Sequence, residues 1–278
     1  MVNKLRKFKD NLLRGLLWFS AFLTVAVLVV IVGYIFYKGY KLINFDFIFG
    51  DYSPVGHGGI WPMIVTTLYT IGISLLIATP IGILAAVYLQ EYAKQGRLVK
   101  MIRYATESLT GIPSIIYGLF GAVFFVTTLK LGMSIISASL TLTIIVLPVI
   151  IRTTEEALKT VPGSYREGSL ALGSTKLQTL YKVILPSAMP GILSGIILSI
   201  GRIVGESAAI FLTAGTVAAM PSSIFSSART LTVHSYLVTQ ESGDIALAAA
   251  VGIVLIVIIL TLNLTATFIS KKLNKADY

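Results

Sequence analysis

Long runs of apolar residues alternate with short polar segments along almost the whole chain. The hydrocarbon core of a bilayer, about 30 Å thick, requires about 20 apolar residues in a helix. The first run is too long for a signal peptide and lacks the small-residue cleavage pattern. The pattern therefore predicts an all-α polytopic membrane protein with six transmembrane helices. The six expected spans are residues 16–37, 61–89, 109–130, 134–151, 189–219 and 245–269.

The composition supports this fold class. Of the 278 residues, 55% are hydrophobic and 12% are charged, whereas about 25% of the residues in soluble globular domains are charged. The formal net charge of +10 is compatible with nucleic-acid binding, but the basic residues lie between apolar runs rather than in a soluble basic domain. We therefore expect membrane lipid, and no nucleic acid, around this chain.

Most of the 22 Lys and Arg residues lie in alternate polar segments. These are the two ends of the chain, the segment after the second run and the segment after the fourth run. Lys and Arg collect in the cytoplasmic loops of membrane proteins. We therefore expect a multi-pass protein of the cell (inner or plasma) membrane with both termini in the cytoplasm, built as a single transmembrane domain over residues 1–278.

The longest cytoplasmic segment, residues 152–188, is amphipathic and contains turn signals. Ser164 and Glu167 have the spacing of a helix-capping box, and Gly173 favours a turn between two short helices. Pro186 is expected to restart the chain into the fifth span. The pattern predicts a helix, a turn and a second helix at the membrane surface, which fits a simple interfacial connector as well as a docking element.

The fifth run carries two charges within an apolar segment. Arg202 and Glu206 lie where charged residues usually face a cavity or one another. Small and polar residues recur with them at helical spacing, which predicts one stripe along a continuous helix. Either the two charges pair as a packing device, or the stripe lines a substrate path. The stripe consists of Gly191, Gly195, Ser199, Arg202, Glu206 and Thr213.

An arginine in such a path is suited to oxyanions, because its planar guanidinium donates two parallel hydrogen bonds. Arg152, at the inner end of the fourth run, has two alternatives: it extends to the membrane interface, or it faces the same path. Glu206 suggests a basis for selectivity. Phosphate near neutral pH keeps a proton that it can donate to a carboxylate, whereas sulfate has none and is repelled.

The cytoplasmic segment follows the pattern E-A-A-x3-G-x9-I-x-L-P of the membrane subunits of ABC importers. The chain also resembles the permease subunits of Pst-type phosphate importers over SYREGSLALGSTKLQT, VILPSAMPGILSGIILSIGR and GRIVGESAA, and over ARTLTVHSYLVTQE it is more similar to the A-type (PstA) than to the C-type subunit. The alanines of the pattern are replaced here by Gly168 and Ser169, and the isoleucine by Val183, which keeps their size class. The matching positions are Glu167, Gly168, Ser169, Gly173, Val183, Leu185 and Pro186.

The resemblance implies an ABC-importer permease (MetI-like) fold, with a coupling helix in residues 152–188 that docks on an ATPase. The implied function is that of a permease subunit of an ATP-driven inorganic phosphate importer, forming half of the translocation path. The implied partners are a second permease subunit of the C-type, two ATP-binding subunits and an extracytoplasmic phosphate-binding protein, for which residues 221–244 are a candidate docking segment.

The absence of a phosphate-binding G-x-x-x-x-G-K-[ST] loop indicates that this chain is not itself an ATPase. It also lacks cysteine and the H-E-x-x-H and G-x-S-x-G motifs, so we expect a non-catalytic subunit with no cofactor of its own, while ATP and Mg²⁺ act on the partner ATPase. Two alternatives stay open: a permease of the same fold for molybdate or sulfate, and a self-contained secondary transporter.

Overall fold

The computed structural model describes residues 2–53 and 58–275, and these residues form helices and loops without a β-strand. The prediction of an all-α protein is therefore confirmed. The helices are α1 (Val2–Gly39), α2 (Phe45–Phe49), α3 (Trp61–Val87), α4 (Arg97–Thr110), α5 (Ser114–Gly121), α6 (Ile135–Thr160), α7 (Gly163–Ala171), α8 (Lys176–Thr179), α9 (Leu185–Gly205), α10 (Ala208–Ala214), α11 (Leu231–Glu241) and α12 (Ile245–Lys275).

Three π-helical turns extend or join these helices. They are η2 (Tyr88–Tyr92) after α3, η3 (Ala122–Thr128) after α5 and η4 (Leu180–Ile184) between α8 and α9; a short 3-10 turn, η1 (Tyr40–Leu42), follows α1. Five helical stretches are long and apolar enough to cross a membrane, and a sixth is obtained if the bent pair α4 and α5 counts as one span. Four of the expected spans thus correspond to α1, α3, α6 and α12.

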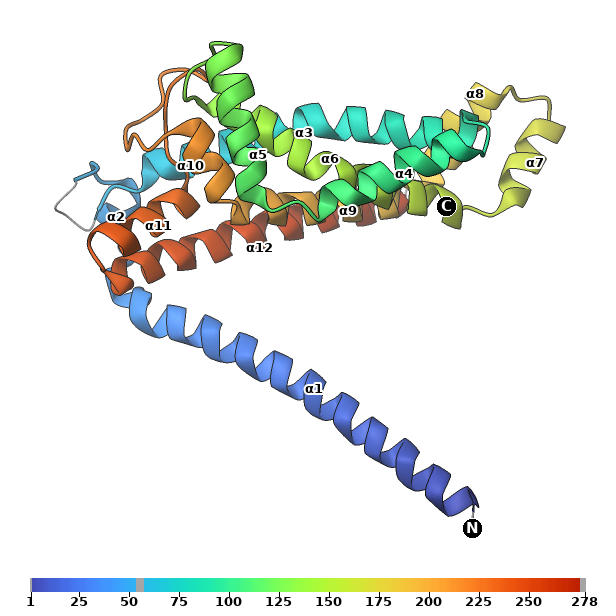
Figure 1. Cartoon of the computed structure of the whole chain (residues 1–278), viewed down its shortest axis with the longest axis horizontal. Coiled ribbons are helices and arrows are strands. Elements are labelled where there is room, and N and C mark those ends of the chain that lie inside the picture. The colour runs from blue at the N-terminus through green and yellow to red at the C-terminus, as the bar shows by residue number, and fades with distance from the viewer. Residues whose placement is uncertain (1, 54–57, 276–278) are drawn as a thin grey trace.

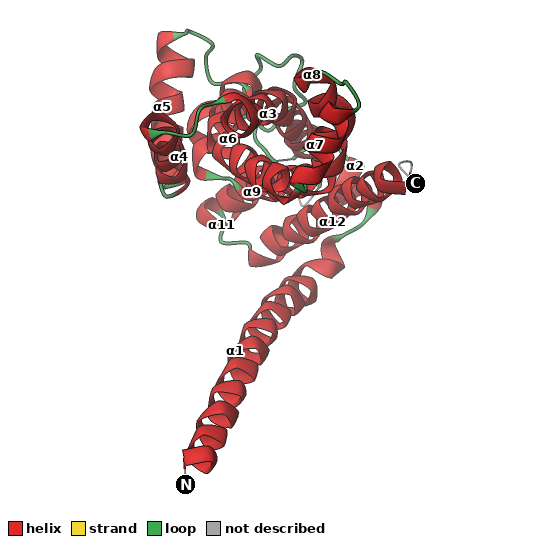
Figure 2. Ribbon diagram, turned by 90° about the vertical axis from the view of Figure 1, so that its right-hand side faces the viewer, coloured by secondary structure: helices red, strands yellow, loops and turns green. Residues whose placement is uncertain are grey.

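Helix α6 is the centre of the bundle, between α3 and α9 (Figures 1 and 2). Glycines permit the close approach of these helices. A Cβ atom on Gly82 of α3 would lie 2.6 Å from Ile150 Cγ2 of α6, and one on Gly191 of α9 would lie 2.5 Å from Ala157 Cβ. The three helices therefore pack with almost no space between their backbones at these points.

The third expected span, residues 109–130, is wrong as a single helix. Helices α4 and α5 meet at an angle of 98°. Helix α4 runs beside α6 (Figure 1), and α5 packs against α10, where a Cβ atom on Gly118 would lie 2.8 Å from Ala209 Cα. The bend falls at residues 111–113, where Pro113 disfavours helical geometry for the preceding residue. The amphipathic helix α4 was not anticipated, because its sequence is too polar for a membrane span.

The fifth expected span, residues 189–219, is wrong at both ends. The helical stretch begins at Lys176 and continues without interruption to Gly205, so Pro186 lies in the first turn of α9 and does not restart the chain. At Glu206 the backbone becomes extended, with φ −78° and ψ 130°. The short helix α10 follows, and the chain leaves it at Gly215, whose φ of 88° favours glycine.

Helix α11 closes the broken end of α9. The Thr232 hydroxyl donates a hydrogen bond of 2.5 Å to the carbonyl oxygen of Val204, and the Leu231 N–H donates one of 3.0 Å to Thr67 Oγ1 of α3. Backbone groups at membrane depth are costly unless they are paired. The hydroxyl of Thr232 thus satisfies a carbonyl group beside the break, and that of Thr67 holds the start of α11 against α3.

Helix α1 leaves the bundle (Figures 1 and 2). Its C-terminal end packs on α12, where a Cβ atom on Gly39 would lie 2.5 Å from the Ala250 nitrogen. Its most apolar stretch has no residue buried within this chain. Side chains such as Trp18 and Phe22, which are 78% and 70% exposed, therefore require lipid or another membrane protein around them.

The close contact of α6 and α9 gives a stability prediction. Gly195→Ala is expected to lower the melting temperature of the purified chain in detergent, because the new methyl group would lie 2.8 Å from Thr153 Cβ and overpacking costs about 1–3 kcal/mol. Gly72→Ala, in α3, is the matched control, since no atom lies within 4 Å of its new methyl group. Equal melting temperatures for the two variants would contradict the close contact.

Candidate functional site

Arg202 lies in the last turn of α9, directly before the break, and is half-buried. At the bend between α4 and α5, Tyr117 of α5 donates a hydrogen bond of 2.7 Å from its hydroxyl to the Leu109 carbonyl oxygen of α4. Among the described residues, Arg202 takes part in none of the ion pairs or side-chain hydrogen bonds. The donors of the Arg202 guanidinium are therefore uncommitted within the part of the chain that the structure describes.

Glu206 does not pair with Arg202. Its side chain is 9% exposed, and its Oε1 accepts a hydrogen bond of 3.1 Å from the Ala209 N–H in the first turn of α10. A carboxylate is favourable there because the first N–H groups of a helix have no intrahelical partner. The helix break also separates Glu206 and Thr213 from the stripe on α9, so the prediction of one continuous polar stripe is wrong.

Ser199 and Thr213 are completely buried within the chain. The Ser199 hydroxyl donates to the Gly195 carbonyl oxygen at 2.9 Å, and that of Thr213 donates to the Ala209 carbonyl oxygen at 2.6 Å. Both hydroxyls are thus satisfied by their own helices at helix contacts. Neither hydroxyl is exposed within this chain, and the place of these residues in a substrate path stays a prediction.

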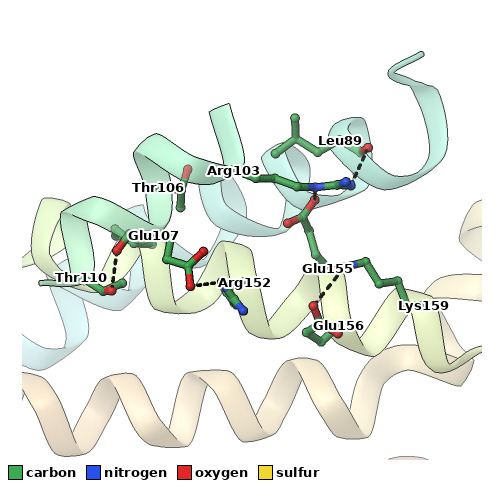
Figure 3. Close-up of a pocket in the computed structure, with 10 residues that line it drawn as sticks. Leu89, Arg103, Thr106, Glu107, Thr110, Arg152, Glu155, Glu156 and Lys159 are labelled. Carbon is green, nitrogen blue, oxygen red and sulfur yellow. Dashed lines mark hydrogen bonds and ion pairs between the residues drawn. The ribbon is translucent and has the colours of Figure 1, made fainter. Parts of the chain in front are cut away.

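Arg152 lines a cavity of about 320 Å³ between α4 and α6, shown in Figure 3. Its Nη1 lies 3.1 Å from Glu107 Oε1 of α4, and both side chains are more than half exposed. An exposed pair of this kind contributes little to stability. Arg152 therefore faces an open, polar cavity, and its place in a substrate path stays a prediction.

Two further ion pairs border the same cavity (Figure 3). Arg103 Nε of α4 lies 3.0 Å from Glu155 Oε1, and the Glu155 side chain is only 7% exposed. Lys159 Nζ lies 2.9 Å from Glu156 Oε1 on the same helix. The cavity thus combines three basic and three acidic side chains, and an anion entering it would compete with Glu107 for Arg152.

The segment expected to hold the coupling helix contains α7 and α8, joined by a turn at Gly173 with φ 84°. This confirms the predicted helix, turn and helix. The predicted cap at Ser164 is wrong, because α7 begins at Gly163 and its preceding residue, Pro162, makes no side-chain cap. A capping box forms instead in α8, where Thr175 and Gln178 bond to each other's backbone N–H.

The pattern residues of this segment take different positions. Glu167 and Gly168 are exposed on α7, whereas the Ser169 hydroxyl lies 2.9 Å from Thr179 Oγ1 of α8. Leu185 and Pro186 are half-buried at the start of α9. Large apolar side chains around them are exposed and form what we call the α7–α8 surface: Tyr165, Leu170, Leu172, Leu177 and Tyr181.

At the opposite end of the bundle, a hydrogen bond of Arg229 joins the segment before α11 to the loop after α2. Its Nη2 donates to the Tyr52 hydroxyl at 3.0 Å, and its Nη1 lies 3.5 Å from His234 Nδ1. Burial, with a contribution from the Arg229 charge, lowers the pKa of His234 to about 4. His234 is therefore neutral near pH 7 and accepts from the guanidinium. Tyr236, in the same helix, is exposed.

Comparison with known proteins shows which family this chain belongs to. Residues 78–275, which include both the cavity and the α7–α8 surface, match the model of the binding-protein-dependent transport system inner membrane components. The chain belongs to this family of transport permeases. The match begins within α3 and leaves α1 outside, in agreement with the separate course of α1 in Figure 1.

Among relatives, the permease is 36% identical to the probable ABC transporter permease protein YqgI of Bacillus subtilis, over 96% of this chain and 98% of that protein. It is 34% identical to the phosphate transport system permease protein PstA 1 of Mycobacterium tuberculosis, over 76% of this chain and 70% of that protein. It is 31% identical to the corresponding PstA of Mycobacterium leprae, over 93% and 88% of the two chains.

Solved structures support the fold of the permease. One chain of a bacterial alginate ABC transporter matches with a TM-score of 0.66 and 18% identity, over 96% of this chain and 95% of that chain. A chain of the MetNI methionine ABC transporter matches with a TM-score of 0.59 and 21% identity, over 77% and 94%. The expected ABC-importer permease fold is therefore confirmed.

The sequence did not reveal the ion pairs that organise this permease. Arg103, Glu107 and Glu155 bring α4 to α6, although the partners lie about 50 residues apart in the chain. The charges at positions 103 and 107 of an amphipathic segment were the only available signal, and they do not specify a partner. Tyr117, whose hydroxyl bonds to the Leu109 carbonyl oxygen across the bend, was interpreted as part of an apolar span.

The role of Glu206 as a cap for α10 leads to a test with two variants. Glu206→Ala is expected to destabilise the permease by about 1 kcal/mol, because it leaves the Ala209 N–H without its acceptor. Glu206→Gln keeps an oxygen acceptor and is expected to retain most of the stability. The melting temperatures of both variants in the same detergent provide the measurement, and a Gln variant as unstable as the Ala variant would refute the capping role.

Proposed function

We propose that this permease is the A-type membrane subunit of an ATP-driven inorganic phosphate importer and forms half of its translocation path. The observation that carries the proposal is the set of phosphate permeases among its relatives, of which the M. leprae protein aligns with 93% of the chain. Arg202, a half-buried arginine with uncommitted donors at membrane depth, supplies the chemistry that an oxyanion requires.

Two arginines mark the proposed substrate path. Arg202 meets the anion at the end of α9, and Arg152 meets it in the cavity between α4 and α6. The Glu107 carboxylate, 3.1 Å from Arg152, competes with the passing anion and keeps its binding weak. Weak binding is required because a transported ion must also leave, so tight selection belongs to the binding protein outside the membrane.

The α7–α8 surface is the proposed contact with the ATPase. It combines the exposed residues Glu167 and Gly168 with large apolar side chains that this chain leaves uncovered. An exposed apolar patch of this kind is typical of a protein interface. ATP and Mg²⁺ are used by the partner, and this chain acts as a non-catalytic subunit without a cofactor of its own.

The complete importer contains a second permease, of the C-type, and two ATP-binding subunits. The exposed apolar stretch of α1 suits the surface of such a permease and the surrounding lipid.

Both termini lie in the cytoplasm, in accordance with the basic residues at the end of the bundle that carries α7 and α8. The opposite end, including residues 221–244 with Arg229 and Tyr236, receives the extracytoplasmic phosphate-binding protein. We take residues 1–278 as a single permease domain.

Reconstitution of the four components tests this function. Proteoliposomes that contain the permease, a C-type partner and the ATPase are expected to accumulate phosphate only when ATP and the binding protein are both present. The same liposomes with the permease alone, under an ion gradient, serve as the control. Uptake by the permease alone would support a secondary transporter, and a preference for molybdate or sulfate would support a different oxyanion importer.

Charge at Glu206 is expected to govern anion preference. Glu206→Gln retains the hydrogen-bond acceptor for α10 but removes the negative charge, so it should admit sulfate more readily while phosphate uptake persists. Arg202→Lys should reduce uptake of phosphate about tenfold or more, because lysine provides a point charge without the two parallel donors. The measurement is uptake of radiolabelled phosphate and sulfate by the reconstituted importer. An unchanged phosphate preference in Glu206→Gln would exclude the carboxylate from selection.

A further inference from the structure

The side chain of Arg166 links α7 to two other elements: the end of α6, which directly precedes α7 in the chain, and η2, 75 positions away. From α7, its Nη2 lies 2.6 Å from Glu91 Oε1 in η2, and its Nε lies 3.3 Å from both carboxylate oxygens. The side chains of Arg166 and Glu91 are 26% and 19% exposed. Because this pair is largely shielded from water, salt screens it less than an exposed pair.

The same guanidinium also donates hydrogen bonds to carbonyl groups at the end of α6. Arg166 Nη1 donates to the carbonyl oxygen of Val161 at 3.0 Å, and Nη2 donates to that of Leu158 at 3.1 Å. The last carbonyl groups of a helix have no intrahelical donor, and a positive charge is favourable beside them. One arginine thus binds the ends of α3 and α6 together with α7.

Helix α7 depends strongly on this link for its position. It contains no buried residue; Tyr165 is 52% exposed, and Leu170, 44% exposed, lines a small pocket with Leu180 and Ile184 of η4. The hydrogen bond from Ser169 connects α7 only to α8. The link from α7 to the end of α3 is therefore polar, and Arg166 provides it with three hydrogen bonds to Glu91, besides its two to the carbonyl groups at the end of α6.

We propose that Arg166 and Glu91 are a positioning pair that transmits movement of the α7–α8 surface to α3 and α6. This proposal rests on the proposed docking of an ATPase at that surface. A first connection exists through the uninterrupted helical stretch Lys176–Gly205, which ends near Arg202. The pair adds a second connection to α3 and, through the carbonyl groups of Leu158 and Val161, to the helix that carries Arg152.

Two connections are needed for the path to open as a unit. Arg202 is on α9 and Arg152 is on α6, so a displacement delivered to α9 alone would strain the tight contact between Gly195 and Thr153. When α7 carries α3 and α6 with it, the three packed helices move together. The pair therefore serves to couple ATP hydrolysis to transport, and not to bind either ligand.

Variants at Glu91 test the proposal, since they leave the bonds from Arg166 to Leu158 and Val161 in place. The measured quantity is the number of phosphate ions transported per ATP hydrolysed by the complete importer in proteoliposomes. Glu91→Gln is expected to keep binding-protein-stimulated ATP hydrolysis but to lower this ratio about threefold or more. Glu91→Lys should lower it further, and Glu91→Asp, which keeps the carboxylate, should retain most of it. Asp10→Asn in α1 is the control for loss of one exposed carboxylate.

A ratio in Glu91→Gln equal to that of the unchanged importer would overturn the proposal. Loss of the ATPase from the purified Glu91→Gln complex would overturn it as well, because the pair would then serve docking rather than transmission. The proposed substrate is tested separately in the same liposomes. If the unchanged importer carries another anion but no phosphate, the proposed function fails, and the coupling ratio can still be measured with that anion.

Discussion

The close contact of α6 with α3 and α9 is the constraint on which the rest of the structure depends. In a bilayer the hydrophobic effect does little to bring helices together, so association relies on packing and hydrogen bonds. Gly82 and Gly191 remove the side chains that would separate these helices, and the Ser74 hydroxyl adds a hydrogen bond of 3.1 Å to the Ser139 carbonyl oxygen of α6. The cavity and the end of the bundle beside α7 are both built on this central helix.

Around that rigid centre, the irregular parts of the chain occur where their backbone groups find partners. The end of α9 is closed by the Thr232 hydroxyl, the start of α10 by the Glu206 carboxylate and the end of α6 by Arg166. The bend between α4 and α5 is different, because Gly111 and Pro113 are exposed. Irregular backbone at membrane depth is tolerated in protein or beside water, which accords with a path shared with a second subunit.

The sequence was sufficient for the features that depend on local composition. The length of the apolar runs predicted four spans, and Gly173 predicted the turn before α8. A charge within the fifth apolar run drew attention to Arg202. Features that depend on partners far along the chain could not be predicted. The break at Glu206 is stabilised by residues of α10 and α11, the burial of Ser199 follows from its contact with α6, and the pairing of Arg166 with Glu91 spans 75 positions. Apolar periodicity contains no information on such contacts.

The uninterrupted stretch Lys176–Gly205 contains 30 residues, which at 1.5 Å per residue is about 45 Å long. It is held most tightly near Gly191 and Gly195, where α6 leaves no free space. A rod held there pivots about that point, and its two arms are unequal: about 25 Å toward α8 and about 14 Å toward Arg202. A sideways displacement of α8 that moved α9 relative to α6 would therefore reach Arg202 reversed in direction and reduced to about half, whereas a displacement shared with α3 and α6 would carry Arg202 along with the whole bundle.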